Sequence, residues 1–496
     1  MRFRFAMVVV AILGFTGRWS LAADKPNLMM FIADDLTWTD CAPFGGKGPG
    51  MTPTPNMERV MKAGMSFNSA FVASPSCAPS RASLLTSMYP MQTGAMFNQI
   101  APKRELKKWP AYFRDIGYEV VAIGKVAHYN QVRQYGFDFV SNFNYHQDDC
   151  VNVAVQWLKD RRARADSGEK VKPLCILVGT NWPHVPWPKN GLGNPADMPI
   201  ASRMVDTPET RVAITRYHAA VANADRDLGK AYDAAKETLG EDTLFAFSSD
   251  HGAQFPGGKW NCYDQGTRVP LYVVWPGKIA AGATTNALVS WIDLMPTFID
   301  VVGGTPPESG LGAGQIAGRS FLNVLTGKAE THREFVFTTH SGDPRMNQYP
   351  QRAVRTKQYK YLRNLDSESE YHSHVDKVAA EGAGSYFPTW LEKAKTDPTA
   401  AKIVQAYFKR PAEELYDVVA DPYETKNLAA DPALSTTKAE LRAELDAWMK
   451  SLGDEGLKTE RVLQDKYVNR NQNAEGGEKP ERADPPSPAA GTAPSK

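Results

Sequence analysis

Near the start of the chain lies Asn27-Leu28-Met29-Met30-Phe31-Ile32-Ala33, an almost wholly apolar run that ends at the acidic pair Asp34-Asp35. Runs that are apolar on both faces are typical of strands buried inside a parallel or mixed sheet. Three similar runs follow along the chain, at residues 119–124, 173–179 and 243–249. The pattern therefore predicts a large, mostly buried sheet.

Helical patterns separate these runs. The clearest is residues 211–240, where apolar side chains recur at helical spacing and Gly240 offers a C-cap. Strands alternating with helices predict an α/β fold, a three-layer sandwich around a large mixed sheet, over residues 24–330.

The chain changes character after about Gly303, where Gly and Pro become frequent. Strands are predicted at 335–339 and 359–364, and a helix at 436–451, which together indicate a smaller C-terminal α+β domain over residues 331–468. Residues 469–496 are mostly Gly, Pro, Ala and polar residues, so they are predicted to be a disordered tail.

The N-terminus resembles a signal peptide. Arg2 and Arg4 precede a short apolar stretch, and small residues at 20–23 offer a cleavage site. Removing residues 1–23 takes the formal net charge from +2 to −1. An uncleaved N-terminal anchor is the alternative. We expect an exported protein, periplasmic or secreted, without stable membrane association after cleavage.

Composition excludes several classes of protein. With 42% hydrophobic and 23% charged residues, the chain is typical of a globular protein rather than a fibrous or disordered one. A near-neutral charge without a basic run argues against nucleic acid as a partner. The odd number of cysteines leaves at least one unpaired, or one used in chemistry: Cys41, Cys77, Cys150, Cys175 and Cys262.

Two acidic clusters follow predicted strands, Asp34-Asp35 and Asp250-His251. Ligands of open α/β sheets bind beyond the carboxyl ends of the strands, and oxygen-rich clusters there suit a hard divalent cation such as Ca²⁺. The alternative is that these Asp residues cap turns. Two pairs in equivalent positions favour the metal site.

The segment Cys77-Ala78-Pro79-Ser80-Arg81 precedes an apolar helical pattern. Pro and Ser mark a helix start, which places Cys77 just outside the positive helix end, where a thiol pKa falls and anions bind. A structural cysteine is the alternative.

Cys77-x-Pro79-Ser80-Arg81 resembles the signature of the type I sulfatases, in which this cysteine is oxidised to Cα-formylglycine. The other family segments occur in the family's order: Asp34-Asp35, Gly124-Lys125, Pro183-His184, Asp250-His251-Gly252 and Lys259. Residues 249–256 and 340–365 look most like the heparan N-sulfatases (sulfamidases), whereas 77–79 and 124–128 are similar to the iduronate-2-sulfatases. The resemblance implies an alkaline-phosphatase-like fold.

The resemblance also implies residue roles. One Ca²⁺ ion would be held by Asp34, Asp35, Cys77, Asp250 and His251, where most sulfatases carry Asn in place of His251. The catalytic residues would be Cys77, Arg81, Lys125, His128, His184 and Lys259. The substrate would contact His184, Lys259, His340 and Arg345.

The partners implied are a sulfated carbohydrate, with N-sulfoglucosamine the first candidate, and a formylglycine-generating maturation enzyme. The alternatives are an O-sulfatase on another polysaccharide, a phosphoester hydrolase, and a glycan-binding protein without turnover. Trp260 and Tyr263 could stack on a sugar ring or belong to the core. His372 and His374 lack a third metal partner and are expected in an exposed loop.

Overall fold

The computed structural model describes residues 25–41, 52–141, 149–343, 346–378 and 383–466. The predicted signal peptide (1–23), the predicted tail (469–496) and Arg345 lie outside the described residues. The five cysteines all lie within them, and each is buried and free of disulfide bonds.

The central sheet has eight strands in the order β5-β4-β6-β1-β7-β8-β2-β9. Strands β5, β4, β6, β1 and β7 run parallel, whereas β8 is antiparallel to both of its neighbours, so the sheet is mixed as predicted. Its strands are β1 Asn27–Ala33, β2 Met65–Phe67, β4 Glu119–Gly124, β5 Phe139–Ser141, β6 Leu174–Gly179, β7 Thr243–Ser249, β8 Leu271–Val274 and β9 Ala283–Thr285.

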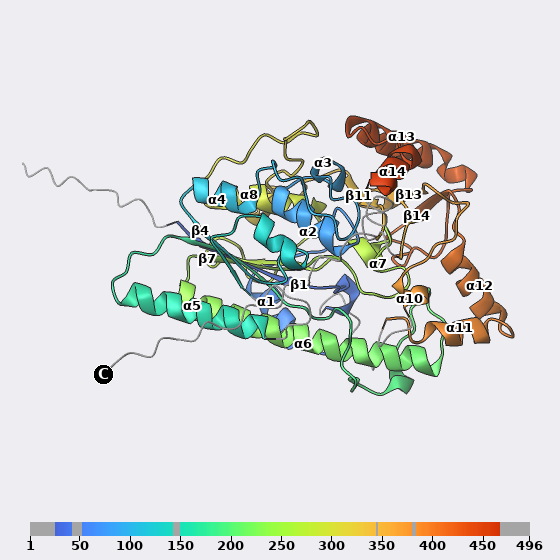
Figure 1. Cartoon of the computed structure of the whole chain (residues 1–496), viewed down its shortest axis with the longest axis horizontal. Coiled ribbons are helices and arrows are strands. Elements are labelled where there is room, and N and C mark those ends of the chain that lie inside the picture. The colour runs from blue at the N-terminus through green and yellow to red at the C-terminus, as the bar shows by residue number, and fades with distance from the viewer. Residues whose placement is uncertain (1–24, 42–51, 142–148, 344–345, 379–382, 467–496) are drawn as a thin grey trace, which may run out of the picture.

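Helices cover both faces of this sheet, which confirms the three-layer sandwich (Figure 1). In β1, Met29 and Phe31 pack against one helical layer, while Leu28 and Met30 pack against the other, because neighbouring side chains of a strand point to opposite faces. The first layer contains α1 Pro55–Ala63, α5 Cys150–Asp166 and α6 Pro208–Leu239; the second contains α2 Cys77–Thr86, α4 Trp109–Asp115 and α8 Leu294–Val301.

The long helix α6 occupies the predicted range with small shifts at its ends. Thr207 caps the first turn by accepting a hydrogen bond from the backbone N–H of Thr210. Gly240, with φ of 83°, ends the helix as the sequence predicted.

A second, antiparallel sheet follows in the C-terminal part, in the order β11-β12-β13-β14. Leu441, Leu445 and Trp448 of α13 pack on one of its faces, and Cys262 and Tyr263 pack on the other. The sheet is thus held between its own helix and the first part of the chain. Its elements are β11 Val336–His340, β12 Gln351–Arg355, β13 Tyr359–Asn364, β14 Glu413–Asp417, α13 Ser435–Ser451 and α14 Leu457–Gln464.

Three helices inserted between β13 and β14 reach back to α6: α10 His374–Lys377, α11 Phe387–Lys393 and α12 Pro398–Phe408. Trp390 of α11 is fully buried, and its indole N–H donates to Thr210 Oγ1 of α6 at 2.7 Å. This contact places the insertion beside the carboxyl ends of the central strands.

Short elements complete the described chain: β3 Ala70–Phe71 paired with β10 Val289–Ser290, α3 Pro90–Thr93, α7 Asp264–Thr267, α9 Leu322–Leu325, and 3₁₀ turns at Trp38–Asp40, Tyr129–Gln134, Pro195–Asp197, Trp291–Asp293 and Pro432–Leu434. Within the part of the chain that the structure describes, no helix combines the length and the apolar character needed to cross a membrane.

Candidate active site

The two predicted acidic clusters meet at the carboxyl edge of the central sheet. β1 and β7 are adjacent and parallel, so Asp34 and Asp35 emerge beside Asp250 and His251. The backbone N–H of Asp35 donates to Asp250 Oδ1 at 3.0 Å, which ties the two strand ends together. All four side chains are buried.

Cys77 lies against this acidic cluster. Its Sγ atom is 3.2 Å from His251 Nε2, 3.9 Å from Asp35 Oδ1 and 4.0 Å from Asp34 Oδ1. The sequence placed Cys77 just before the helix, but it is the first residue of α2, because the helical turn already begins after Ser76. The thiol still sits at the positive end of the helix, as expected.

Charges around Cys77 change its acidity. Burial alone would raise the pKa of the thiol, but Lys125, Lys259 and His251 outweigh burial and lower that pKa. Lys125 Nζ lies 4.0 Å from the sulfur. The position therefore stabilises negative charge on residue 77.

Arg81 and Lys125 hold the acidic cluster from one side. The fully buried Arg81 donates from Nε to Asp250 Oδ2 at 2.9 Å and from Nη2 to Asp34 Oδ1 at 3.1 Å. Its Nη1 donates to the backbone carbonyl of Lys125, whose own Nζ pairs with Asp34 Oδ2. Burial would raise the pKa of Asp34, but Lys125, His184 and Arg81 hold it well below its usual range.

Lys259 holds the cluster from the other side, donating to Asp35 Oδ1 at 3.1 Å and Oδ2 at 2.9 Å. Burial nevertheless raises the pKa of Asp35 to about 7, despite Lys259 and His251. The surrounding side chains thus leave the negative charge of Asp35 incompletely balanced, and a cation would balance it.

The donor set fits a divalent metal ion. Ligand atoms of Asp35, Cys77, Asp250 and His251 all lie within 4.8 Å of one another, and so do those of Asp34, Asp35 and His184. His251 Nδ1 is 3.0 Å from the backbone carbonyl of Gly252, a contact that requires Nδ1–H and points Nε2 at the cluster. Burial opposes protonation of this ring, but the charges of Asp250, Cys77 and Asp35 raise its pKa to about 9, and a bound cation would replace the proton on Nε2. Three carboxylates with one imidazole are suited to a hard cation of the Ca²⁺ type.

His128 and His184 flank the cluster. His128 Nε2 is 2.8 Å from Gln99 Oε1, and its buried Nδ1 has no hydrogen-bond partner among the described residues. His184, between the cis peptide bonds Trp182–Pro183 and Val185–Pro186, places Nε2 3.7 Å from Asp35 Oδ2. Burial and the charges of Lys125 and Lys259 lower the pKa of both imidazoles well below the usual value.

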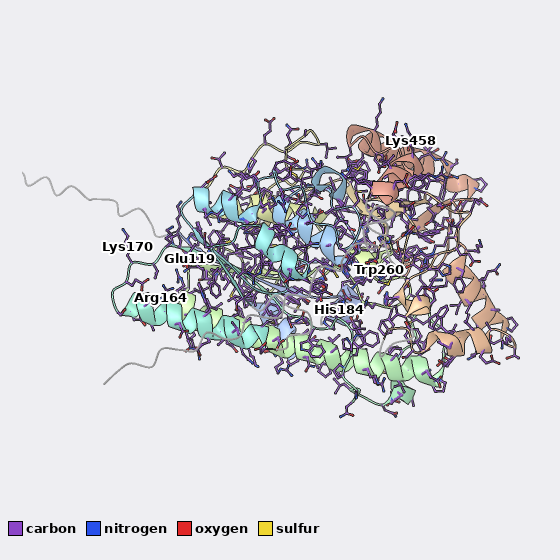
Figure 2. The ribbon with its side chains drawn as sticks, viewed as in Figure 1. Glu119, Arg164, Lys170, His184, Trp260 and Lys458 are labelled. Carbon is purple, nitrogen blue, oxygen red and sulfur yellow. The ribbon has the colours of Figure 1, made fainter. Side chains whose placement is uncertain are left out.

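A cavity of about 450 Å³ opens onto these groups. Figure 2 shows His184 and Trp260 between the end of the sheet and the C-terminal elements, whereas Glu119, which begins β4, lies at the opposite end. Cys77, His128, His184, Lys259, Trp260 and His374 are among the residues that line the cavity. Trp260 thus faces the cavity, while Tyr263 packs beneath the C-terminal sheet.

The expectation of an exposed loop is wrong for His374. It begins α10, is 6% exposed and lines the cavity, because the helical insertion folds back over the strand ends. His372 is partly exposed and pairs through Nδ1 with Asp376 Oδ2 at 2.7 Å.

His340, expected to contact substrate, is not brought to the cavity. Its side chain is fully buried in β11, with Nε2 2.8 Å from Asn347 Oδ1, and its ring lies 5.9 Å from that of Trp260, which occupies the cavity wall instead.

Sequence reasoning missed several lining residues: Asn98, Gln99, Tyr129 and Gln254. Asn98 Oδ1 accepts a hydrogen bond from the backbone N–H of Ala78 at 3.0 Å, which steadies the start of α2. Of these four residues, only Tyr129 and Gln254 could have been found from the sequence, because they lie beside or within the family segments that contain His128 and His251.

Comparison with known proteins identifies the family to which the chain is similar. A family model described as sulfatase matches residues 26–304, and one described as N-sulphoglucosamine sulphohydrolase, C-terminal, matches residues 257–377. An ulvan-active sulfatase of Formosa agariphila is 28% identical, over 88% of this chain and 82% of its own. Human N-sulphoglucosamine sulphohydrolase is 27% identical, over 85% of this chain and 89% of its own.

The fold has close structural counterparts. A solved protein in complex with its substrate D-glucosamine-2-N,6-O-disulfate superposes with a TM-score of 0.64 at 18% identity, covering 87% of this chain and 99% of its own. This likeness supports the alkaline-phosphatase-like architecture that the sequence predicted. With the first family model covering more than half of the chain, the protein belongs to the sulfatase family and is an enzyme that hydrolyses sulfate esters or sulfamates.

Proposed function

We propose that this sulfatase removes sulfate groups from a sulfated glycan after Cys77 is oxidised to Cα-formylglycine by a maturation enzyme. The observation that carries the proposal is the position of Cys77, buried at the start of α2 within 4.0 Å of Asp34, Asp35, His251 and Lys125. A nucleophile at this point reaches both the anion-stabilising cations and the carboxylate cluster.

One divalent cation, with Ca²⁺ the first candidate, is proposed to be held by Asp34, Asp35, Asp250 and His251, next to residue 77. When bound, it would polarise a sulfate oxygen and favour ionisation of the nucleophile.

The chain's own residues supply the rest of the proposed mechanism. The hydrated formylglycine at position 77 contributes the oxygen that attacks sulfur. Arg81 and Lys125 hold the charge on the residue 77 oxygens and on sulfate. Lys259, or His184 after its imidazole has taken up a proton, gives a proton to the departing atom, and His128, whose Nδ1 is unpartnered, takes a proton from the second hydroxyl so that sulfate is expelled.

The first substrate candidate is N-sulfoglucosamine. The match to the C-terminal model of N-sulphoglucosamine sulphohydrolase spans four residues that line the cavity: Lys259, Trp260, Met346 and His374. The second candidate is an O-sulfate of an ulvan-type polysaccharide, favoured by the relative from Formosa agariphila. Export by the predicted signal peptide, residues 1–23, would bring the enzyme to either polymer.

The test starts from protein purified from its native host. We expect the peptide that contains Cys77 to have the mass of the aldehyde, and the protein to release sulfate from N-sulfoglucosamine or ulvan oligosaccharides faster than phosphate from matched phosphate esters. Cys77→Ala should abolish release, whereas Cys262→Ala, a buried cysteine outside the cavity, should retain it. An intact thiol would favour the glycan-binding alternative, and faster phosphate release would favour a phosphoester hydrolase.

A further inference from the structure

One part of the cavity wall, formed by His374 and Gln254, presents polar atoms that have no partner. His374 is 6% exposed and Gln254 is 5% exposed, and both line the cavity that contains Cys77. Among the described residues, neither His374 Nε2 nor Gln254 Oε1 has a hydrogen-bond partner. Buried polar atoms are rarely left unpaired, so these atoms call for a ligand.

The tautomer of His374 follows from its contact with Trp260. The indole Nε1–H of Trp260 donates to His374 Nδ1 at 2.8 Å. An indole nitrogen is only a donor, so Nδ1 must carry a lone pair, and the neutral ring must carry its hydrogen on Nε2. The unpartnered atom is therefore a hydrogen-bond donor.

The surroundings of His374 keep its ring neutral. Burial and the nearby charge of Lys259 lower its pKa to about 3, although a contact of the ring with the backbone carbonyl of Gln254, which does not meet hydrogen-bond geometry at Nε2, acts in the opposite direction. A neutral ring with hydrogen on Nε2 cannot take a proton at that atom, so His374 does not act as a general base through Nε2.

Gln254 adds the complementary group. Its amide oxygen is an acceptor in the same cavity, so the two side chains offer one donor and one acceptor. A hydroxyl group both donates and accepts, and it satisfies such a pair. Aliphatic atoms of the cavity wall, from Val185, Pro186 and Met346, suit the C–H faces of a sugar ring.

We propose that His374 and Gln254 form a saccharide subsite, in which His374 Nε2–H donates to a hydroxyl of the sugar that carries the reacting sulfate and Gln254 Oε1 accepts from it. The subsite rests on the proposed function only in that the sulfate group is placed at the Cys77 cluster. It does not require that the sulfate be hydrolysed. It selects sulfated sugars over sulfate alone, since sulfate alone needs only the cationic cluster.

The test measures equilibrium binding in the Cys77→Ala background, which cannot turn over. His374→Asn keeps an acceptor near Trp260 Nε1 but lacks the Nε2–H donor, whereas His374→Gln restores an amide donor near that position. We expect His374→Asn to weaken binding of N-sulfoglucosamine or a sulfated ulvan oligosaccharide about three- to tenfold, because one neutral hydrogen bond is lost. Binding of inorganic sulfate should not change, and His374→Gln should recover part of the loss.

His372→Asn is the matched control, a histidine on the same segment that lies outside this cavity. In the matured enzyme, His374→Asn should raise KM for the saccharide more than it lowers kcat, with the pH profile unmoved. Equal weakening of saccharide and inorganic sulfate, or a saccharide affinity that does not change, would overturn the subsite. So would a wild-type protein that binds both saccharides no more tightly than inorganic sulfate.

The two proposals fail in different ways. If the matured enzyme binds a saccharide in a manner that depends on His374 but releases no sulfate, the subsite stands and the proposed function fails. If sulfate is released at a rate that His374→Asn leaves unchanged, the proposed function stands and the subsite fails.

Discussion

Four residues around the cavity hold a backbone conformation that side chains other than glycine rarely adopt. They are Asp35, Gln99, Tyr129 and Trp260, with φ of 66°, 74°, 47° and 72°. Each costs on the order of 1–2 kcal/mol and persists only where surrounding contacts impose it. Lys259 binds Asp35 through both carboxylate oxygens, and His374 accepts a hydrogen bond from Trp260. Contacts within the site therefore stabilise the strained backbone at these two residues.

A prediction at the residue scale concerns His340. Burial lowers its pKa to about 3, so the ring is neutral in the folded protein but protonates near pH 6.5 once unfolded. Its contribution to stability is therefore complete above about pH 6.5 and is lost as the pH falls toward 3. At pH 4 the free energy of unfolding is lower by about 3 kcal/mol because of His340. Urea unfolding at pH 7, 5.5 and 4 measures this decrease, and the His340→Gln protein should lack it.

His372→Gln is the control for this experiment, since His372 is partly exposed beside Asp376 and should leave the wild-type loss in place. A His340→Gln protein that loses as much stability on acidification as the wild type would contradict the assignment.

At the scale of the elements, the end of β4 at Gly124 lies very close to the end of β6 at Gly179, just before Lys125. A Cβ on Gly124 would lie 2.0 Å from the carbonyl oxygen of Gly179, and Gly124 also has φ of +77°. Neither strand end can accept a side chain there without moving. The close approach is what lets the Lys125 amide bond to Gly179 and aim its side chain at Asp34.

Gly124→Ala should therefore destabilise the protein by about 2–4 kcal/mol and reduce sulfate release, because Lys125 is displaced. Denaturant unfolding and a sulfate-release assay measure the two effects. Gly168→Ala is the matched control: its φ of +92° imposes the same kind of strain, but no atom lies within 4 Å of the added Cβ. It should cost about 1–2 kcal/mol and spare activity; equal effects of both variants would refute the steric argument.

At the scale of the whole molecule, the proposed metal site would link stability to cation binding. Asp34 and Asp35 follow β1, Asp250 follows β7, and Cys77 begins α2, so the donor set forms only when the sandwich is folded. A cation that binds only the folded state adds about 4 kcal/mol at a thousand times its dissociation constant.

We therefore expect Ca²⁺ to raise the Tm in calorimetry and a chelator to reverse the change. Asp250→Asn should lower the response to Ca²⁺, while Asp446→Asn, on the exposed side of α13, should keep it. A Tm that is the same with Ca²⁺ and with chelator would argue against the cation.

The sequence alone predicted four of the eight strands of the central sheet and the long helix, and it singled out the residues of the proposed catalytic cluster. Strands 119–124 and 243–249 and the cap at Gly240 agree with the structure because apolar periodicity and glycine conformation act locally. The Cys77 motif and its partners were recognisable because each lies in a short segment of its own.

Contacts between residues far apart in the sequence became visible only in the folded structure. Strand β12 was not predicted from the sequence because Gln351, Arg352 and Arg355 are polar, although all three are buried. Arg352 is paired at 2.6 Å with Asp454 and with Glu460, about a hundred residues away, and no local pattern reveals such partners. The same holds for His374, which the insertion brings to Trp260: its burial, its tautomer and its place in the cavity come from a contact across 114 residues.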